Sequence, residues 1–552
     1  MTQNQNAGAY LGFLSTQRPP AIGTQGAVAS PNYLATQAGQ EVIKQGGHAI
    51  DAAITMNTVL CVVYPHMAGL GGDLFSLIWD KDSGAVEAIN GSGKSGQNVT
   101  SEFYLSKGYD EIPQRGPLAA NTVPGTVHAW WEMHQKYGKV EWTELFTRAI
   151  HYAENGFPIS NKFSDFLAEK QDVLQMHEET KSIFLKDDYL AKEGDLFKQP
   201  DLANSLKLIA EKGPSVFYEG ELADKIIAGL EKHGGLLTKE DLESHQTEWQ
   251  EPLQSTYRGY DVFQVRPNTQ GLASLIILNI LEEFDLNEIG DNTPDYYHLM
   301  AEATKLAFLY RDEWVTDEND MKRKPEELIA KELGKELAGK IRFDQLTPEL
   351  ERKKDLPIFQ TSRDTTYMCA VDNDGNTCSL IQSVYHEFGS GFIAEGTGFI
   401  LQNRGSFFSL DENHPNCLKP GKKTFHTIIP AMMLKDGKPF MLYGSMGGEG
   451  QPQTQAAIAT RVIDFGYNIQ QAIEAPRWLH GKTWGADSET FKLEGRISDS
   501  ITDELAKRGQ LVERLGDWTG TMGHAQGIVF DHEKGTLSAG ADPRGDGLGL
   551  SW

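Results

Sequence analysis

The feature that most constrains the fold is a pair of β-rich runs around an Asp-Gly turn. Residues 365–383 read TTYMCAVDNDGNTCSLIQS. β-branched and aromatic residues favour strands, and an Asp-Gly pair between two such runs is a strong hairpin signal. Similar patterns predict more strands and hairpins in GFILQN (398–403), TIIPAMMLKDGKPFMLYGSMGG (427–448) and GIVFDHEKGTLSAGADPRG (527–545). From residue 357 onward the chain is therefore expected to be rich in strands.

The part before residue 357 has mostly helical periodicity. Residues 24–90 predict a strand, two helices broken at Gly46-Gly47, and a second strand after the glycine-rich YPHMAGLGGD. The spacing of apolar residues predicts further helices in 126–156, in 160–245 with a break at KGPSVFYEGE, in 294–316, and on the surface in the charged stretch 318–356.

Composition and charge exclude several classes of protein. The 552 residues are 39% hydrophobic and carry a formal net charge of −26, which is typical of a globular protein and disfavours binding to nucleic acid or to an anionic membrane. Four cysteines without a C-x-x-C pair predict four buried thiols rather than a disulfide framework. No metal-ligand motif and no cofactor motif is present. The N-terminus lacks a basic and an apolar signal region, and no apolar run reaches membrane-spanning length, so a cytoplasmic location is expected.

Several residues around the hairpin could take part in nucleophilic catalysis. Thr365 and Thr366 open the first strand, and a second hydroxyl, that of Ser383, lies on the return strand. The glycines of GSMGGEGQPQ (444–453) follow another predicted strand, where their backbone N–H groups could face a developing oxyanion. Taken singly, each feature also fits ordinary structure: a threonine pair can open a strand, and two glycines can form a turn.

A set of motifs spread over nearly the whole chain carries a family resemblance. These motifs are YPHMAGLGGDLF, NTVPGTVHAW, HLMAEATKLAFLYRD, DTTYMCAVDNDGNTCSL, FGSGF, GSMGG and ADPRGDG. Together they resemble the gamma-glutamyltranspeptidase family of N-terminal-nucleophile (Ntn) hydrolases. The resemblance implies an α+β fold, a four-layer αββα sandwich whose mature form is one structural domain.

The resemblance also implies self-cleavage. The Thr365 hydroxyl would attack the carbonyl of Asp364, giving a large subunit (1–364, helix-rich) and a small subunit (365–552, strand-rich) that stay associated. The new α-amine of Thr365, with a reference pKa of about 7.7–8.0, would act as the general base beside its own hydroxyl. Gly447 and Gly448 would form the oxyanion hole, and Ser383 would orient the nucleophile. The sequence leaves open whether the processed heterodimer forms a homo-oligomer.

The residues expected to bind substrate depart from the family pattern. Where the family has an arginine for the substrate α-carboxylate, this chain has Ser92, with Lys94 nearby as a point charge. The family asparagine is replaced by Tyr385, the aspartate that binds the α-amine falls at Phe407, and a Ser-Ser pair is His426-Thr427. Asn403 and Arg404 lie in the segment NRG, and Arg404 can bind a carboxylate bidentately. Arg404 could equally form an ion pair at the surface or between subunits, His426 could be a structural histidine, and Tyr385 and Phe407 could be packing residues.

Three functions remain in competition at this point. The first is hydrolysis of the amide of a small, carboxylate-bearing acyl group, as in the divergent branch of the family that includes oxamate amidohydrolase and cephalosporin-acylase-like members. The second is a true gamma-glutamyltransferase or glutathione hydrolase, with ligands rebuilt from Lys94, Tyr385 and His426. The third is an unprocessed, non-catalytic homologue.

Overall fold

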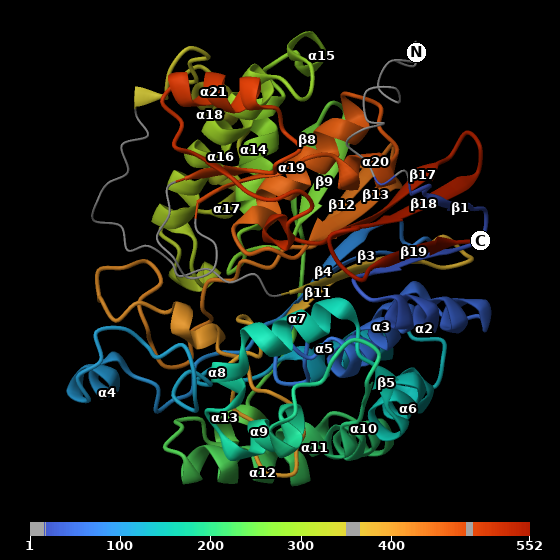
Figure 1. Ribbon diagram of the computed structural model, residues 1–552, viewed down its shortest axis with the longest axis vertical. Helices are drawn as coiled ribbons and strands as arrows, with labels where there is room; N and C mark the ends of the chain where they lie inside the picture. Colours follow the sequence, from blue (N-terminus) through green and yellow to red (C-terminus); the bar gives the residue numbers. More distant parts are fainter. Residues whose placement is uncertain (1–15, 17, 349–364, 482–489) are drawn as a thin grey trace.

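The centre of the molecule is a pair of stacked seven-stranded antiparallel sheets (Figure 1). The computed structural model describes residues 16, 18–348, 365–481 and 490–552. The first sheet, sheet A, has the order β1 (Ala21–Gly23), β18 (Thr536–Ala541), β17 (Ala525–Asp531), β13 (Lys438–Ser445), β12 (Ala431–Lys435), β9 (Tyr260–Gln264) and β8 (Leu253–Tyr257). The second, sheet B, has the order β19 (Leu548–Ser551), β2 (Ala27–Ser30), β10 (Thr366–Val371), β11 (Thr377–Ser383), β3 (Asp73–Trp79), β4 (Val86–Gly91) and β7 (Glu248–Gln250).

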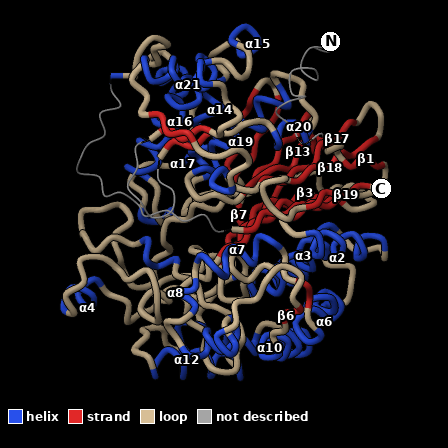
Figure 2. The backbone as a smooth tube through the Cα atoms, in the orientation of Figure 1, coloured by secondary structure: helices blue, strands red, loops and turns tan. Residues whose placement is uncertain are grey.

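Helices cover the outer face of each sheet, so the predicted αββα sandwich is confirmed (Figures 1 and 2). The layer on sheet A contains α14 (Gly271–Leu281), α15 (Leu286–Ile289), α16 (Pro294–Trp314), α17 (Pro325–Leu328), α18 (Lys331–Ala338), α19 (Gly450–Ile463), α20 (Ile469–Glu474) and α21 (Asp499–Lys507). The layer on sheet B contains α2 (Tyr33–Lys44), α3 (Ala49–Val63), α5 (Thr126–Tyr137), α6 (Thr147–Asn155), α7 (Asn161–Glu169) and, farther out, α4 (Ser101–Ser106), α8 (Gln171–Leu174), α9 (Glu178–Phe184), α10 (Pro200–Lys212), α11 (Ser215–Tyr218), α12 (Glu221–Lys232) and α13 (Lys239–Glu243).

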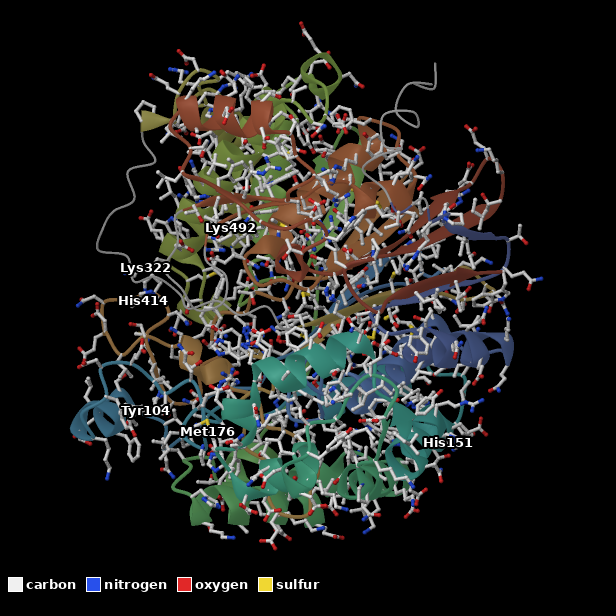
Figure 3. All side chains as sticks on the ribbon, in the orientation of Figure 1. Tyr104, His151, Met176, Lys322, His414 and Lys492 are labelled. Atoms are coloured by element: carbon white, nitrogen blue, oxygen red, sulfur yellow. The ribbon has the colours of Figure 1, made fainter. Side chains whose placement is uncertain are left out.

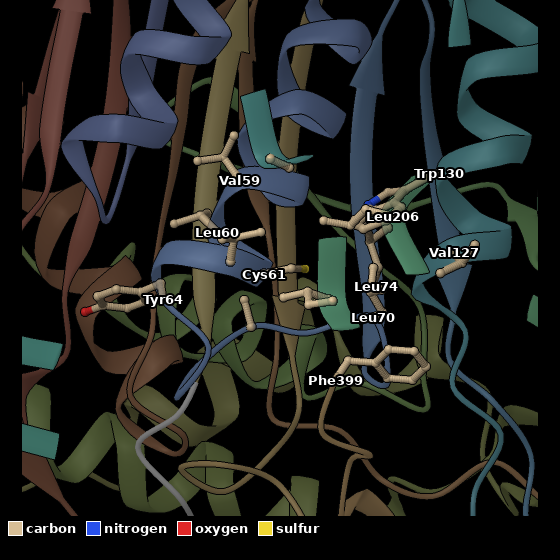
Figure 4. Close-up of a cluster of buried hydrophobic side chains, with 14 of the residues drawn as sticks. Val59, Leu60, Cys61, Tyr64, Leu70, Leu74, Val127, Trp130, Leu206 and Phe399 are labelled. Atoms are coloured by element: carbon tan, nitrogen blue, oxygen red, sulfur yellow. The ribbon is translucent and has the colours of Figure 1, made fainter. Parts of the chain in front are cut away.

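The helix α3 shows why the sheet-B layer is thick. All of its residues are buried, because one side packs on β10 and β11 while others meet α5 and α6. Figure 4 shows part of this core, with Leu60 and Cys61 of α3 beside Leu74 of β3 and Trp130 of α5. The packing holds the two strands that carry the predicted hairpin.

Side chains fill the spaces between all four layers (Figure 3). The apolar cluster between the two sheets includes Phe75, Tyr367, Ile381, Leu442 and Ile528. Small sheets lie outside the sandwich: β14 (Trp478–His480), β15 (Phe491–Leu493) and β16 (Val512–Arg514) form one, and β5 (Phe157–Pro158) and β6 (Leu196–Phe197) form another.

Most of the predicted elements match. The hairpin is confirmed, with Thr366 opposite Gln382 and Val371 opposite Thr377. The prediction of a strand over 398–403 is wrong, since this segment forms only isolated bridges. Gly396 and Gly398, at φ +70° and +74°, turn the backbone there instead of letting it extend. The last part of the predicted 318–356 helical stretch lies outside the described residues.

The thiol prediction holds for three cysteines. Cys61, Cys369 and Cys378 are buried and unbridged, while Cys417 is partly exposed. None of the helices in the described ranges is long and apolar enough to span a bilayer.

Candidate active site

The predicted nucleophile lies at the start of a central strand of sheet B. Thr366 is paired with Gln382 in the antiparallel ladder, and Ser383 is paired with Asp73 of β3. Continuing the β10–β11 register by one residue puts Thr365 level with Ser383. Thr365, Ser383 and Asp73 therefore stand side by side on three neighbouring strands, and all three are fully buried.

The alternation of side chains along the strands shows from which face of sheet B these three residues project. Tyr367, Ile381 and Phe75 lie two residues from Thr365, Ser383 and Asp73, and all three belong to the core between the sheets. Because strand side chains alternate with a period of two, Thr365, Ser383 and Asp73 project on the same inner side, toward sheet A.

The glycine turn predicted as the oxyanion hole lies across from them on sheet A. Gly444 of β13 packs on the Tyr367 ring so closely that an added Cβ would lie 2.5 Å from a ring carbon. Three residues later, Gly447 and Gly448 connect β13 to α19 at φ +127° and +53°, conformations that favour glycine. Within the described residues, neither glycine N–H donates a hydrogen bond to a backbone carbonyl. The turn thus combines two N–H donors with the start of a helix, an arrangement suited to an oxyanion.

A buried arginine lies next to Ser383. The Arg404 side chain is fully buried in the short helix η6 (Arg404–Phe407). Its Nη2 donates to Ser383 Oγ at 3.2 Å, and its Nη1 donates to Thr427 Oγ1 at 3.4 Å. The guanidinium lies 4.3 Å from the centroid of the Tyr385 ring, which in turn lies 4.7 Å from the Phe407 ring. The alternative of an Arg404 at the protein surface is wrong, because the aromatic rings and the hydroxyls enclose it.

Asn403 lies beside Arg404, but its side chain forms hydrogen bonds with backbone groups. Its Oδ1 accepts from His386 N at 3.0 Å and its Nδ2 donates to Gln114 O at 2.7 Å. These bonds fix the loop that carries Tyr385, whose φ of +81° is unusual for a non-glycine residue.

His426 is held in a buried polar network behind the site. Its Nε2 lies 2.8 Å from Asp73 Oδ2, and its Nδ1 lies 3.1 Å from Asn268 Nδ2. Burial lowers the pKa of His426, and the nearby Arg404 charge lowers it further. Ser92 joins the same network through Asn90 and Asn268. This arrangement favours the structural interpretation of His426.

One predicted residue is not brought into this cluster, and a second is not among the described residues. Lys94 is exposed, and its backbone bridges to Lys423. Asp364 lies outside the described residues.

Three residues of the site were missed at the level of sequence. Asp73 accepts from the N–H groups of Gly93 and Gly125 as well as facing His426. Gln270 bonds the carbonyls of Thr427 and Gly448, and Arg311 bonds Gln270. Asp73 directly follows the motif Gly-Leu-Gly-Gly, and Arg311 is the next-to-last residue of the helix motif HLMAEATKLAFLYRD. These motifs could have marked Asp73 and Arg311, whereas Gln270 lies in none of the motifs.

Among the described residues, no group of three or more His, Cys, Asp or Glu side chains could hold a metal ion.

Comparison with known proteins agrees with this architecture. The family model of gamma-glutamyltranspeptidase matches residues 35–552. The chain is 47% identical to the glutathione hydrolase-like YwrD proenzyme of Bacillus subtilis over 96% of this chain and 99% of that protein. It is 39% identical to the oxamate amidohydrolase proenzyme of Klebsiella pneumoniae, again over 96% and 99%. The structure of a cephalosporin acylase from Bacillus halodurans superposes with a TM-score of 0.89 at 38% identity, over 97% of both chains. The sandwich fold and these relatives make the protein an Ntn-type amidohydrolase, and the chain belongs to the gamma-glutamyltranspeptidase family.

Proposed function

We propose that the protein cleaves itself before Thr365 and then hydrolyses the amide of a small, carboxylate-bearing acyl group through an acyl-enzyme on Thr365. The observation that carries the proposal is the position of Arg404, buried against Ser383, which the strand register puts level with Thr365. A carboxylate bound by Arg404 would then lie close to the nucleophile.

The first step would be an attack of Thr365 Oγ on the Asp364 carbonyl carbon. An Oγ–C bond forms, the Asp364–Thr365 C–N bond breaks, and the nitrogen takes up a proton to become the free amine. Water then hydrolyses the ester, which leaves the Asp364 carboxylate and restores the Thr365 hydroxyl. The N–H groups of Gly447 and Gly448 would stabilise the oxyanion in each attack.

The same chemistry would act on the substrate. The Thr365 amine accepts the hydroxyl proton as Oγ attacks the substrate carbonyl, and it returns this proton to the leaving amine. Water completes hydrolysis, and an amino acid in its place would give acyl transfer. Ser383 would orient the nucleophile, because its hydroxyl accepts from both Tyr385 N at 2.9 Å and Arg404 Nη2 at 3.2 Å.

The aromatic pair restricts the size and charge of the acyl group. Tyr385 and Phe407 are 1% and 5% exposed, and their rings pack against each other at a tilt of 37°. Phe407 stands where the family has the aspartate for a substrate ammonium, and a phenyl ring leaves such an ammonium without a charged partner. Leaving a buried polar group unpaired costs on the order of 1–3 kcal/mol, and a charged group costs more. This disfavours a free γ-glutamyl amino acid and favours a short acid such as the oxamate named for one relative.

Glutathione hydrolysis is kept as a second candidate because a relative 47% identical is named glutathione hydrolase-like. The two candidates differ in whether the acyl group carries an α-ammonium. A panel of oxamate, a glutaryl amide, glutathione and a γ-glutamyl anilide therefore separates them, with the purified protein and its Thr365→Ala variant assayed in parallel.

We expect release of ammonia or amine from oxamate or the glutaryl amide, and none by Thr365→Ala. Turnover of glutathione with the greater kcat/KM would replace the first candidate with the second. A Thr365→Ala variant that is still cleaved and still active would overturn the assignment of the nucleophile.

A further inference from the structure

The peptide units of the Gly447–Gly448 turn are held through their carbonyl groups. Gly447 O accepts from Gly450 N at 2.8 Å, and Gly448 O accepts from Gln451 N at 3.2 Å. Met446 O faces Gly523, where an added Cβ would lie 2.0 Å from this oxygen. In a planar trans peptide the N–H points opposite to the C=O. Fixing the carbonyls of Met446 and Gly447 therefore fixes the direction of the N–H groups of Gly447 and Gly448.

One side chain connects this turn to the arginine cluster. Gln270 Nε2 donates to Gly448 O at 2.9 Å and to Thr427 O at 2.6 Å. The Thr427 hydroxyl is the one that accepts from Arg404. A single, fully buried amide thus bridges the two sides of the site, the oxyanion turn and the residue next to the carboxylate ligand.

Arg311 orients that amide. Its Nη1 donates to Gln270 Oε1 at 3.0 Å, and its Nη2 donates to Glu449 Oε1 at 2.8 Å, directly after the glycines. Its Nε donates to Asp312 Oδ1 at 2.7 Å, and the side chain is only 1% exposed. With its oxygen engaged by Arg311, the Gln270 amide must turn its two N–H donors toward the carbonyls.

The two tethering residues come from the other side of the proposed cleavage point. Gln270 caps α14 and Arg311 lies in α16, both before residue 365, whereas Thr427, Gly448 and Glu449 follow it. After cleavage the oxyanion turn of the small subunit would still be held by the large subunit.

We propose that Gln270, oriented by Arg311, is a positioning residue that sets the spacing between the carboxylate ligand Arg404 and the oxyanion donors of Gly447 and Gly448. This inference rests on the proposed function. The oxyanion exists only while the carbonyl is under attack. A substitution of Gln270 should therefore destabilise the transition state and leave the affinity for the substrate unchanged.

The test uses self-cleavage, for which the chain is its own substrate. Full-length chain made by cell-free translation is followed over time for conversion at Thr365, as the wild type, Gln270→Glu and Gln270→Met. Gln270→Glu keeps the shape but sets a carboxylate against two carbonyls, and Gln270→Met removes the donors without adding charge. We expect both variants to be cleaved at least about tenfold more slowly, because small displacements of catalytic groups have effects of this size or larger. In processed enzyme, kcat should fall while KM stays within about twofold.

Gln199 offers a matched control. Its Nε2 donates to a backbone carbonyl, that of Val62, at 2.8 Å, and it is 2% exposed at the start of α10. Gln199→Glu and Gln199→Met make the same chemical changes away from the site, so they should leave the cleavage rate unchanged. Thermal unfolding of all four variants identifies any general loss of folding.

The outcomes separate the two proposals. A wild-type chain that is cleaved at Thr365, with folded Gln270 variants cleaved and active within about twofold of it, would overturn the positioning role and leave the proposed function standing. Equal slowing of the Gln199 and Gln270 variants would also overturn it. A folded wild-type chain that is not cleaved at Thr365 would overturn the proposed function and this inference with it.

Discussion

Gly523 provides a quantitative test of how the Gly447–Gly448 turn, the proposed oxyanion hole, is held. It has φ +76°, and a Cβ on it would lie 2.0 Å from Met446 O, whereas real Cβ contacts are essentially never below 3.0 Å. The Gly523→Ala substitution must therefore move the Met446–Gly447 peptide, or the 520–523 segment, by about 1 Å. Since a misplacement of about 1 Å can reduce a rate roughly 10²-fold, self-cleavage of Gly523→Ala should slow by about two orders of magnitude.

The assay is the same time course of precursor conversion, with thermal unfolding measured alongside. Gly466→Ala is the control, because Gly466 has φ +69° but nothing within 4 Å of the added Cβ. It therefore carries a similar backbone strain, roughly 1–2 kcal/mol, without the collision. Cleavage of a folded Gly523→Ala chain at the rate of Gly466→Ala would refute the reasoning that Met446 O orients the Gly447 N–H.

Two further predictions address Arg404 and the pH dependence of stability. Arg404→Lys keeps the charge but loses the planar fork, so kcat/KM for a carboxylate-bearing amide should fall about 10- to 100-fold. In the control Arg461→Lys, kcat/KM should change little, because the buried Arg461 guanidinium donates to the backbone carbonyls of Ala472 and Pro476 rather than to a site residue. Equal losses in the two variants would contradict the carboxylate role. Burial lowers the pKa of His524 from 6.5 to about 4, so the native state binds fewer protons than the unfolded state between these values. His524 thus contributes roughly 3 kcal/mol above pH 6.5 that is lost as pH falls toward 4. The urea midpoint should drop over that range, less so in His524→Gln, and an unchanged pH dependence in this variant would contradict the assignment.

Local patterns predicted the hairpin that follows Thr365, the proposed nucleophile. The runs 366–371 and 377–383 are adjacent in sequence and joined by a tight turn, so their pairing needs no distant information. The register then places Ser383 level with Thr365, as the sequence had suggested. The stretch 398–403 also contains a run of apolar residues. Gly396 and Gly398, just before and at its start, have positive φ, so the backbone turns there instead of extending into a sheet.

Contacts between distant residues could not be predicted. Gln270 contacts Thr427 and Gly448 across 157 and 178 residues of sequence, and no local periodicity encodes such a bond. The burial of Arg404 could not be predicted either. Its sequence neighbours allow a surface ion pair, and only the packing of Tyr385 and Phe407 around it settles its environment.

A positive charge on a side chain also did not predict whether that side chain lies in the site. Lys94 and Arg404 were both candidates for a carboxylate ligand, yet Lys94 is exposed and Arg404 is fully buried. A desolvated guanidinium interacts more strongly with a carboxylate than an exposed ammonium does, which is why the proposed function relies on Arg404.

The most direct test of the central claim is an intact-mass spectrum of the purified protein under denaturing conditions. Self-cleavage by Thr365 predicts two species whose masses correspond to residues 1–364 and 365–552, with Thr365 as the first residue of the smaller one. A single species at the full 61.2 kDa, or cleavage at another bond, would contradict the account.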